Sequence, residues 1–183
     1  MPPTEPTVKR TLVFIDGQNL FHAAKEAFGY DYPNYDVRAL ASALCRAEGW
    51  TLVGARFYTG VPDARDNAHW NHFWNAKLAR MGWQGVRVFS RSLRYRHQTV
   101  RLPDGTAQTV LVGREKGIDV RIALDAVHAV RTAACDVALI FSQDQDLSEV
   151  ADEVRLIARD QNRWLKIASA FPSSPTARNR RGI

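Results

Sequence analysis

The chain alternates between short apolar runs and longer segments in which apolar residues recur every three or four positions. Short runs rich in Val and Ile are typical of strands buried on both faces, and the recurring pattern is typical of helices with one packed face. We expect strands at 11–16, 50–58, 86–89, 136–141 and 164–168. We expect helices at 18–28, 36–48, 66–81, 118–132 and 147–158. This alternation predicts right-handed crossovers and an α/β fold, a three-layer α/β/α sandwich around a mostly parallel sheet.

Two of the helices have patterns that predict how they pack. The second predicted helix has an apolar stripe made of Leu40, Ala43, Leu44 and Ala47. In the third, Trp70, Phe73 and Trp74 recur at helical spacing, which is more typical of core packing than of a base-stacking platform. His69 and His72 lie on its other side. Histidines three apart without a further ligand are typical of a solvated surface rather than of a metal site.

Residues 92–112 break the alternation of strands and helices. Two extended segments, 93–102 and 106–112, flank Pro103-Asp104-Gly105, which is a strong turn signal. We expect an inserted or edge β-hairpin here. Its arginines are Arg91, Arg94, Arg96 and Arg101. Two interpretations stay open, because such charges could bind phosphates or could keep an exposed strand edge from pairing with another chain.

The composition favours one globular domain with an anionic partner. With 183 residues and 45% hydrophobic residues, the chain is long and apolar enough to bury a core. We expect a flexible lead-in at 1–10, the domain at 11–171, and a basic Ser/Pro/Arg tail at 172–183. The net charge of +6 favours a polyanion such as nucleic acid. A homo-oligomer stays open.

The chain lacks the signals of a secreted or membrane protein. Cys45 and Cys135 have no paired spacing, which favours a reducing, cytoplasmic location over a disulfide scaffold. No segment approaches the roughly 18 apolar residues that a membrane span needs. The first residues lack the apolar core of a signal peptide. We therefore expect no membrane partner.

Aspartates mark three separate connections at one expected edge of the sheet. Asp16 ends the first strand, Asp119 opens a helix, and Asp144 and Asp146 follow the strand at 136–141. Each has an ordinary alternative. Asp16 could bond to backbone N–H groups of its turn, Asp119 could favour a helix dipole, and Asp146 could form a capping box with Glu149.

The coincidence of these carboxylates predicts a metal site. Without a cation, clustered acids repel or hold protons. Oxygen ligands suit Mg²⁺ or Mn²⁺, which would polarise a phosphoryl oxygen and lower the pKa of an attacking water. The sequence has no Walker phosphate loop, no GxSxG elbow and no GxGxxG turn, so those chemistries lose support.

The aspartates belong to three motifs, which are Phe14-Ile-Asp16-Gly-Gln-Asn19, Glu115-Lys116-Gly-Ile-Asp119-Val and Phe141-Ser-Gln-Asp144-Gln-Asp146-Leu. Together these motifs resemble an NYN domain, a branch of the PIN-like nuclease superfamily. The resemblance implies a PIN-like, Rossmann-like fold and a metal-dependent ribonuclease. By position it implies a metal site of Asp16, Asp119, Asp144 and Asp146. Asn19 would orient a ligand or a water, and Lys116 would lie near the substrate phosphate. The family more often has Gly or Ser where this chain has Gln143 and Gln145.

The sequence as a whole predicts a metal-dependent nuclease that acts on nucleic acid, with RNA as the expected substrate. One alternative is a module that binds nucleic acid or regulates without catalysis. Another is a phosphatase-like or receiver-like acidic pocket. A receiver site usually has paired acids after its first strand, and Gly17 follows Asp16 here, which disfavours that alternative.

Overall fold

The computed structural model describes residues 3–103, 105–175 and 182–183. The strands are β1 (Arg10–Asp16), β2 (Thr51–Val61), β3 (Val86–Ser92), β4 (Arg94–Arg101), β5 (Ala107–Arg114), β6 (Val137–Phe141) and β7 (Lys166–Ala170). The helices are α1 (Gly17–Phe28), α2 (Val37–Ala47), α3 (Ala68–Trp83), α4 (Ile118–Arg131) and α5 (Ser148–Asp160), with a short 3-10 turn, η1 (Gln145–Leu147), before α5. Residues 1–2, Asp104 of the predicted turn and 176–181 of the predicted tail lie outside the described residues.

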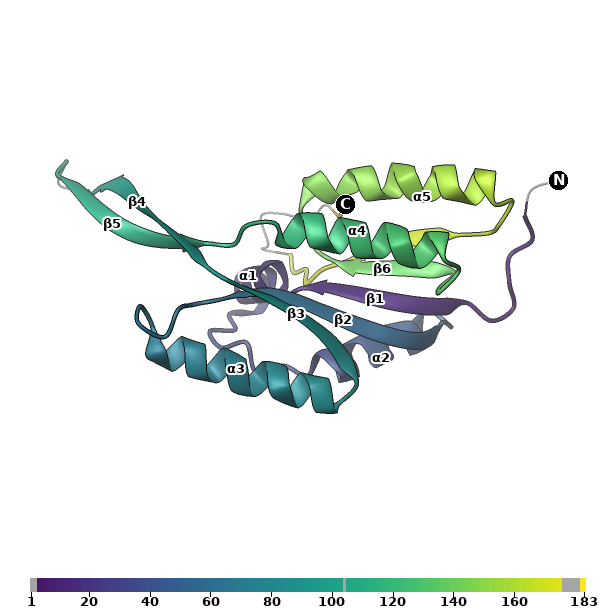
Figure 1. The fold of residues 1–183 in the computed structure, drawn as a ribbon, viewed down its shortest axis with the longest axis horizontal. Coiled ribbons are helices and arrows are strands. Elements are labelled where there is room, and N and C mark those ends of the chain that lie inside the picture. The colour runs from purple at the N-terminus through teal and green to yellow at the C-terminus, as the bar shows by residue number, and fades with distance from the viewer. Residues whose placement is uncertain (1–2, 104, 176–181) are drawn as a thin grey trace.

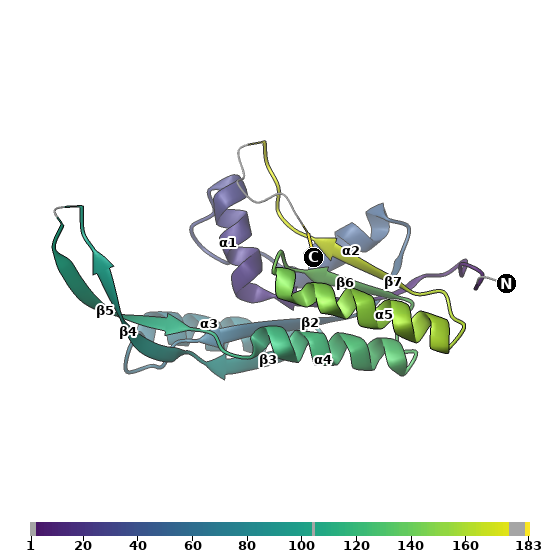
Figure 2. The same cartoon turned by 90° about the horizontal axis from the view of Figure 1, so that it is seen from above.

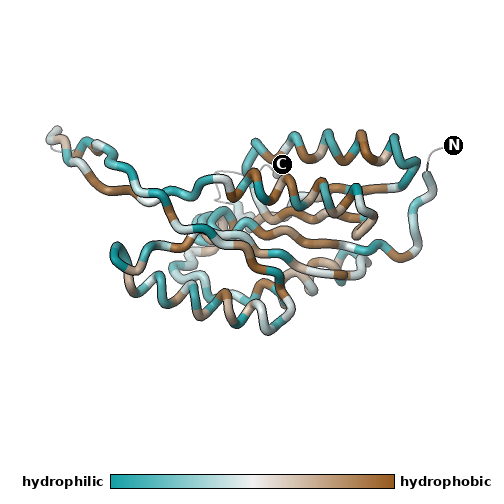
Figure 3. The backbone as a smooth tube through the Cα atoms, viewed as in Figure 1, coloured by the Kyte–Doolittle hydropathy of each residue, from teal (hydrophilic) through white to brown (hydrophobic). Residues whose placement is uncertain are grey.

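The main sheet has five parallel strands in the order β3-β2-β1-β6-β7. Helices α4 and α5 cover one face, and α1, α2 and α3 cover the other (Figures 1 and 2). Apolar residues concentrate along the central strands (Figure 3). This arrangement confirms the predicted three-layer α/β/α sandwich. We call the side of the sheet on which the parallel strands end its carboxyl edge, because ligands of such sheets collect there.

The central strand β1 is buried on both faces, as its apolar run predicts. Phe14 packs with α4 and α5, whereas Val13 and Ile15 pack with the helices on the opposite face. These three side chains are 0% exposed. The strand ends at Asp16, so the packing of β1 fixes the position of that carboxylate.

The aromatic stripe of α3 packs on the core, as predicted, but only Trp74 is fully buried. Trp74 is buried against Phe57 of β2, and Trp70 and Phe73 are half-buried beside it. His69 and His72 are exposed. The predicted stripe of α2 is wrong. Its buried side chains are Val37, Ala41 and Cys45. Leu44 is half-buried, and Ala43 and Ala47 are exposed. Apolar residues lie almost all round this helix, and only its docking on β2 decides which of them are covered.

The predicted β-hairpin forms a second, two-stranded antiparallel sheet that projects from the body (Figures 1 and 2). Successive side chains of a strand alternate between faces. Arg94 and Arg96 therefore share one face with Arg114, which pairs with Arg94, and Arg101 lies on the other face. The predicted arginines are exposed but do not form a single surface.

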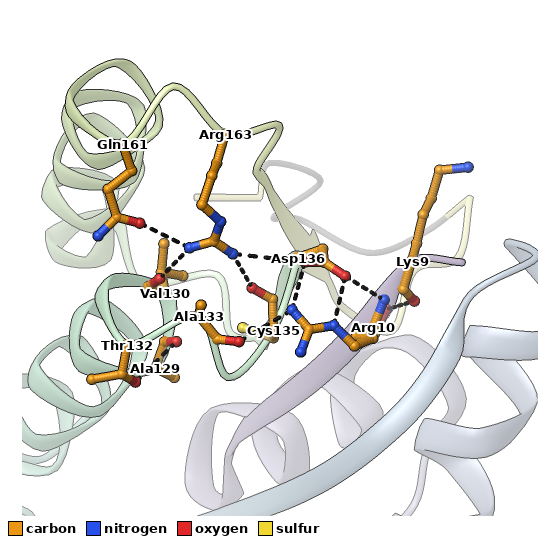
Figure 4. A network of polar contacts seen from close by, with 11 residues as sticks. Lys9, Arg10, Ala129, Val130, Thr132, Ala133, Cys135, Asp136, Gln161 and Arg163 are labelled. Carbon is orange, nitrogen blue, oxygen red and sulfur yellow. Dashed lines mark hydrogen bonds and ion pairs between the residues drawn. The ribbon is translucent and has the colours of Figure 1, made fainter. Parts of the chain in front are cut away.

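A polar network closes the opposite side of the sheet, where the strands begin (Figure 4). The Arg10 guanidinium donates to both carboxylate oxygens of Asp136, at 3.0 and 2.8 Å, and Arg163 lies 3.7 Å from the same carboxylate. Arg163 also donates to the carbonyl of Cys135 at 3.3 Å. These contacts join the starts of β1 and β6 to the turn before β7, far from the carboxyl edge.

Candidate functional site

Asp16 lies at the carboxyl edge and is 7% exposed. It caps α1, because its Oδ1 accepts a hydrogen bond from the backbone N–H of Asn19 at 3.0 Å. Asp is among the best residues at this position. The next residue has to be small, since a Cβ on Gly17 would lie 2.4 Å from the Phe57 ring and 3.0 Å from the Tyr58 carbonyl. The turn interpretation of Asp16 is therefore correct, and it does not exclude a second role for the carboxylate.

Asn19 links α1 to the connection after β6. Its side-chain oxygen accepts a hydrogen bond from the backbone N–H of Gln143 at 3.0 Å. Because β1 and β6 are neighbours, with Ile15 paired to Phe141, this bond holds the two connections together at the carboxyl edge. In the structure, Asn19 thus orients the backbone that carries the acids of the third motif.

Asp144 and Asp146 follow the buried Ser142 in that connection. The backbone N–H of Asp144 donates to Ser142 Oγ at 3.1 Å, and Asp144 Oδ1 accepts from the N–H of Asp146 at 3.0 Å. Asp144 therefore caps η1, and it is half-buried whereas Asp146 is exposed. The capping box considered for Asp146 does not form, since the N-cap residue of α5 is Leu147 and no side chain caps this helix. The amide of Gln145 donates to the carbonyls of Gln143 and Gly182.

Glu115 is a candidate that the sequence did not single out. Its carboxylate accepts hydrogen bonds from the backbone N–H of Gly60 and from Thr59 Oγ1, the latter at 3.4 Å. The strand predicted to end at residue 58 continues through Gly60 as part of β2. A Cβ on Gly60 would lie 2.7 Å from Glu115 Cγ, so only glycine admits the carboxylate here. The sequence signal that could have identified Glu115 is its place in the second motif, directly before Lys116.

Electrostatics show that these acids form one group. Burial, together with the charges of Asp144 and Asp119, raises the pKa of Asp16 to about 6. Burial, together with the charges of Asp16 and Asp119, raises the pKa of Glu115 to about 7. Removal from water and nearby like charges both disfavour the ionised form of a carboxyl. The three separate connections thus bring acids close enough to repel one another.

The donor chemistry of this group fits a hard divalent cation. Every candidate ligand is an oxygen, and His and Cys contribute none. Across residues 3–103, 105–175 and 182–183, however, no group of three or more His, Cys, Asp or Glu side chains is arranged so that it could hold a metal ion. Asp16, Asp119 and Asp144 therefore interact through their charges without forming a preassembled set of ligands.

Basic residues flank the acids on the side of the hairpin. Lys116 is exposed, and its carbonyl accepts a hydrogen bond from Arg91 at 3.3 Å. Arg91 and Arg121 each lie 5.3 Å from the centre of the Phe89 ring. These cations lie between the base of the hairpin and the first turns of α4.

Comparison with protein families identifies the chain. The family model described as NYN domain matches residues 10–173. The chain therefore belongs to the NYN domain family, which confirms the resemblance carried by the three motifs. The family is part of the PIN-like nuclease superfamily, whose members usually use divalent metals. A comparison with curated proteins gives no match. In the described part of the chain, no helix has both the length and the apolar character needed to cross a membrane.

Proposed function

We propose that this chain is a nuclease that depends on Mg²⁺ or Mn²⁺ and hydrolyses phosphodiester bonds in RNA. The observation that supports this proposal most directly is the burial of Asp16. Its pKa is raised to about 6 by this burial and by the charges of Asp144 and Asp119. A divalent cation would relieve this repulsion. Membership of the NYN family supports the same chemistry.

Asp16, Asp119 and Asp144 are the proposed ligands of the metal, with Asp146 as an outer ligand because it is exposed. A metal bound there would polarise a phosphoryl oxygen and lower the pKa of an attacking water. Asn19 positions the connection that carries Asp144. A carboxylate with a pKa of about 7 accepts protons efficiently near neutral pH, so we assign Glu115 the role of general base.

The substrate would be held by cations outside the acidic group. Lys116 lies three residues before Asp119 and is the proposed contact for the phosphate beside the scissile bond. Arg94, Arg96 and Arg101 of the hairpin would bind the strand further out, mainly through phosphate charge. A cytoplasmic location is part of the proposal, supported by the buried, unpaired Cys45 and Cys135.

One observation favours a second candidate, a module that binds nucleic acid without cleaving it. In the described residues the acids do not form a preassembled set of metal ligands. Such a module would keep the basic surface and the family fold.

A cleavage assay separates the two candidates. Single-stranded RNA is incubated with wild type, Asp16→Asn and Asp160→Asn, with Mn²⁺ or with EDTA. Asp160 is an exposed acid at the end of α5 and serves as the matched control. The nuclease proposal expects cleavage by wild type and Asp160→Asn with Mn²⁺ only, and none by Asp16→Asn. If wild type binds RNA but never cleaves it, the second candidate is correct.

A further inference from the structure

A cavity of about 760 Å³ lies between α3 and the segment that leads from α1 into α2. Its walls include Tyr32, Tyr35 and Phe73, together with Ala76 and Met81. This volume is typical of pockets that bury a small organic ligand, and a mostly apolar lining with a few polar groups is usual for such pockets. None of the roles assigned above uses this cavity.

The aromatic wall is held in place by contacts between rings. The Tyr32 ring lies edge-on to Phe73, with centroids 4.7 Å apart, and 5.1 Å from the Trp70 ring. Tyr32 is nevertheless 40% exposed, although a large aromatic side chain is stabilised by burial. The cavity thus offers planar apolar surface on rings that their neighbours restrain.

The charged groups of the cavity favour an anionic ligand. Lys77 Nζ donates to the Tyr35 carbonyl at 2.8 Å and lies 5.2 Å from the centre of the Tyr35 ring, and Arg80 adds a second cation. Asp36 is the acid among the described lining residues. Its carboxylate caps α2 by accepting hydrogen bonds from the N–H groups of Arg38 and Ala39. It also accepts a hydrogen bond from the Gln84 amide.

Tyr35 connects the cavity with the acidic group. Its hydroxyl lies 3.5 Å from the carbonyl of Gly17, the residue after Asp16. Burial and the charge of Asp16 both raise the pKa of the Tyr35 phenol. The cavity also extends along α3 from Ala68 and His69, which follow the end of β2 at the carboxyl edge (Figure 1). Tyr35 therefore lines the cavity and also contacts the turn that carries Asp16.

We propose that this cavity receives an unpaired nucleobase of the strand that is cleaved at the carboxyl edge. The base lies against Tyr32 and Phe73, and Lys77 and Arg80 face the adjoining phosphate. Stacking on aromatic side chains tolerates any base, because every base has a π-face. A base inside a duplex is already stacked and paired, so the pocket selects single-stranded nucleic acid. The inference rests on the proposed function and names its substrate class.

The test measures binding in EDTA, so that its outcome does not depend on catalysis. Ala76→Phe places a ring inside the cavity, whereas Ala79→Phe adds the same ring to the same helix at an exposed position that does not line it. Both variants are first compared with wild type by thermal unfolding. Affinity is then measured by fluorescence anisotropy with a labelled single-stranded RNA of about ten nucleotides and with the same sequence as a duplex.

Ala76→Phe is expected to weaken binding of the single strand about fivefold or more, the equivalent of losing one stacked base. The affinity of Ala79→Phe for the single strand, and the affinities of both variants for the duplex, should stay within twofold of wild type. Arg80→Gln should weaken single-strand binding without removing an aromatic wall. Equal affinities of Ala76→Phe and Ala79→Phe would overturn the inference, even if wild type cleaves RNA. Conversely, affinity for the single strand could fall only in Ala76→Phe while wild type never cleaves RNA. That result would support the base-binding cavity and reject only the proposed nuclease activity.

Discussion

The side-chain oxygen of Asn19 accepts a hydrogen bond from the backbone N–H of Gln143 at 3.0 Å. The two residues are 124 positions apart in the sequence. Their bond joins the first turn of α1, which Asp16 caps, to the connection that carries Asp144. The relative position of two proposed metal ligands thus depends on a third side chain that carries no charge.

Asn19→Ala should lower metal-dependent cleavage about tenfold or more, because the connection after β6 loses its link to α1. The free energy of unfolding should fall by only about 1 kcal/mol, the usual contribution of one hydrogen bond. Initial cleavage rates and urea unfolding measure the two effects, with Asn75→Ala on the exposed face of α3 as the control. A rate equal to that of the control would show that Gln143 is held by other contacts.

The raised pKa of Asp16 predicts how pH affects stability without metal. Its folded pKa of about 6 lies above the ordinary value of 3.8. The stability that this proton confers is therefore present below about pH 4 and is lost as pH rises through 6. Glu115, with a pKa of about 7, extends the same trend to higher pH.

Relative to Asp16→Asn, wild type in EDTA should thus become less stable between pH 4 and pH 7, by on the order of 2 kcal/mol. Urea unfolding across this range measures the difference, with Asp160→Asn as the control. A difference that does not change with pH would mean that Asp16 ionises normally in the folded protein.

The hairpin arginines should contribute to RNA affinity through phosphate charge. Replacing both Arg94 and Arg96, which share a face, with Gln should reduce the slope of log affinity against log salt by about 0.7 for each lost contact with a single strand. Arg101→Gln tests the opposite face. Arg46→Gln with Arg159→Gln removes the same charge from other exposed positions. An unchanged slope would favour the alternative in which the arginines protect a strand edge.

Asp136 should stabilise the fold without affecting catalysis. Its hydrogen bonds with Arg10, above all, lower the pKa of its carboxyl. This stabilisation is present above the unfolded pKa near 4 and is lost progressively as pH falls from there through the lowered folded pKa. Asp136→Asn should lower the free energy of unfolding by about 1–3 kcal/mol at pH 7. Urea unfolding at pH 7 and pH 3 measures this, and an equal loss at both would contradict the charge-based account.

The sequence predicts best what depends on local pattern. The apolar runs of β1 and β6 predict buried parallel strands, and parallel strands bring the connections of Asp16 and Asp144 to one edge. Glu115 was not predicted because its position depends on a hydrogen bond from the N–H of Gly60, 55 residues earlier in the sequence. It also depends on the absence of a side chain at Gly60, which the sequence pattern does not connect with Glu115. The faces of the hairpin arginines depend on strand register. The cavity beside α3 depends on how two distant segments pack.

The central claim is that the acids at the carboxyl edge bind a divalent metal through Asp16. Titration of Mn²⁺ into the metal-free protein, followed by calorimetry, tests it most directly. Wild type and Asp160→Asn should bind Mn²⁺ with the same affinity, and Asp16→Asn should lose at least tenfold, because Asn lacks the charge that holds the cation. Equal Mn²⁺ affinity of wild type and Asp16→Asn would contradict the account.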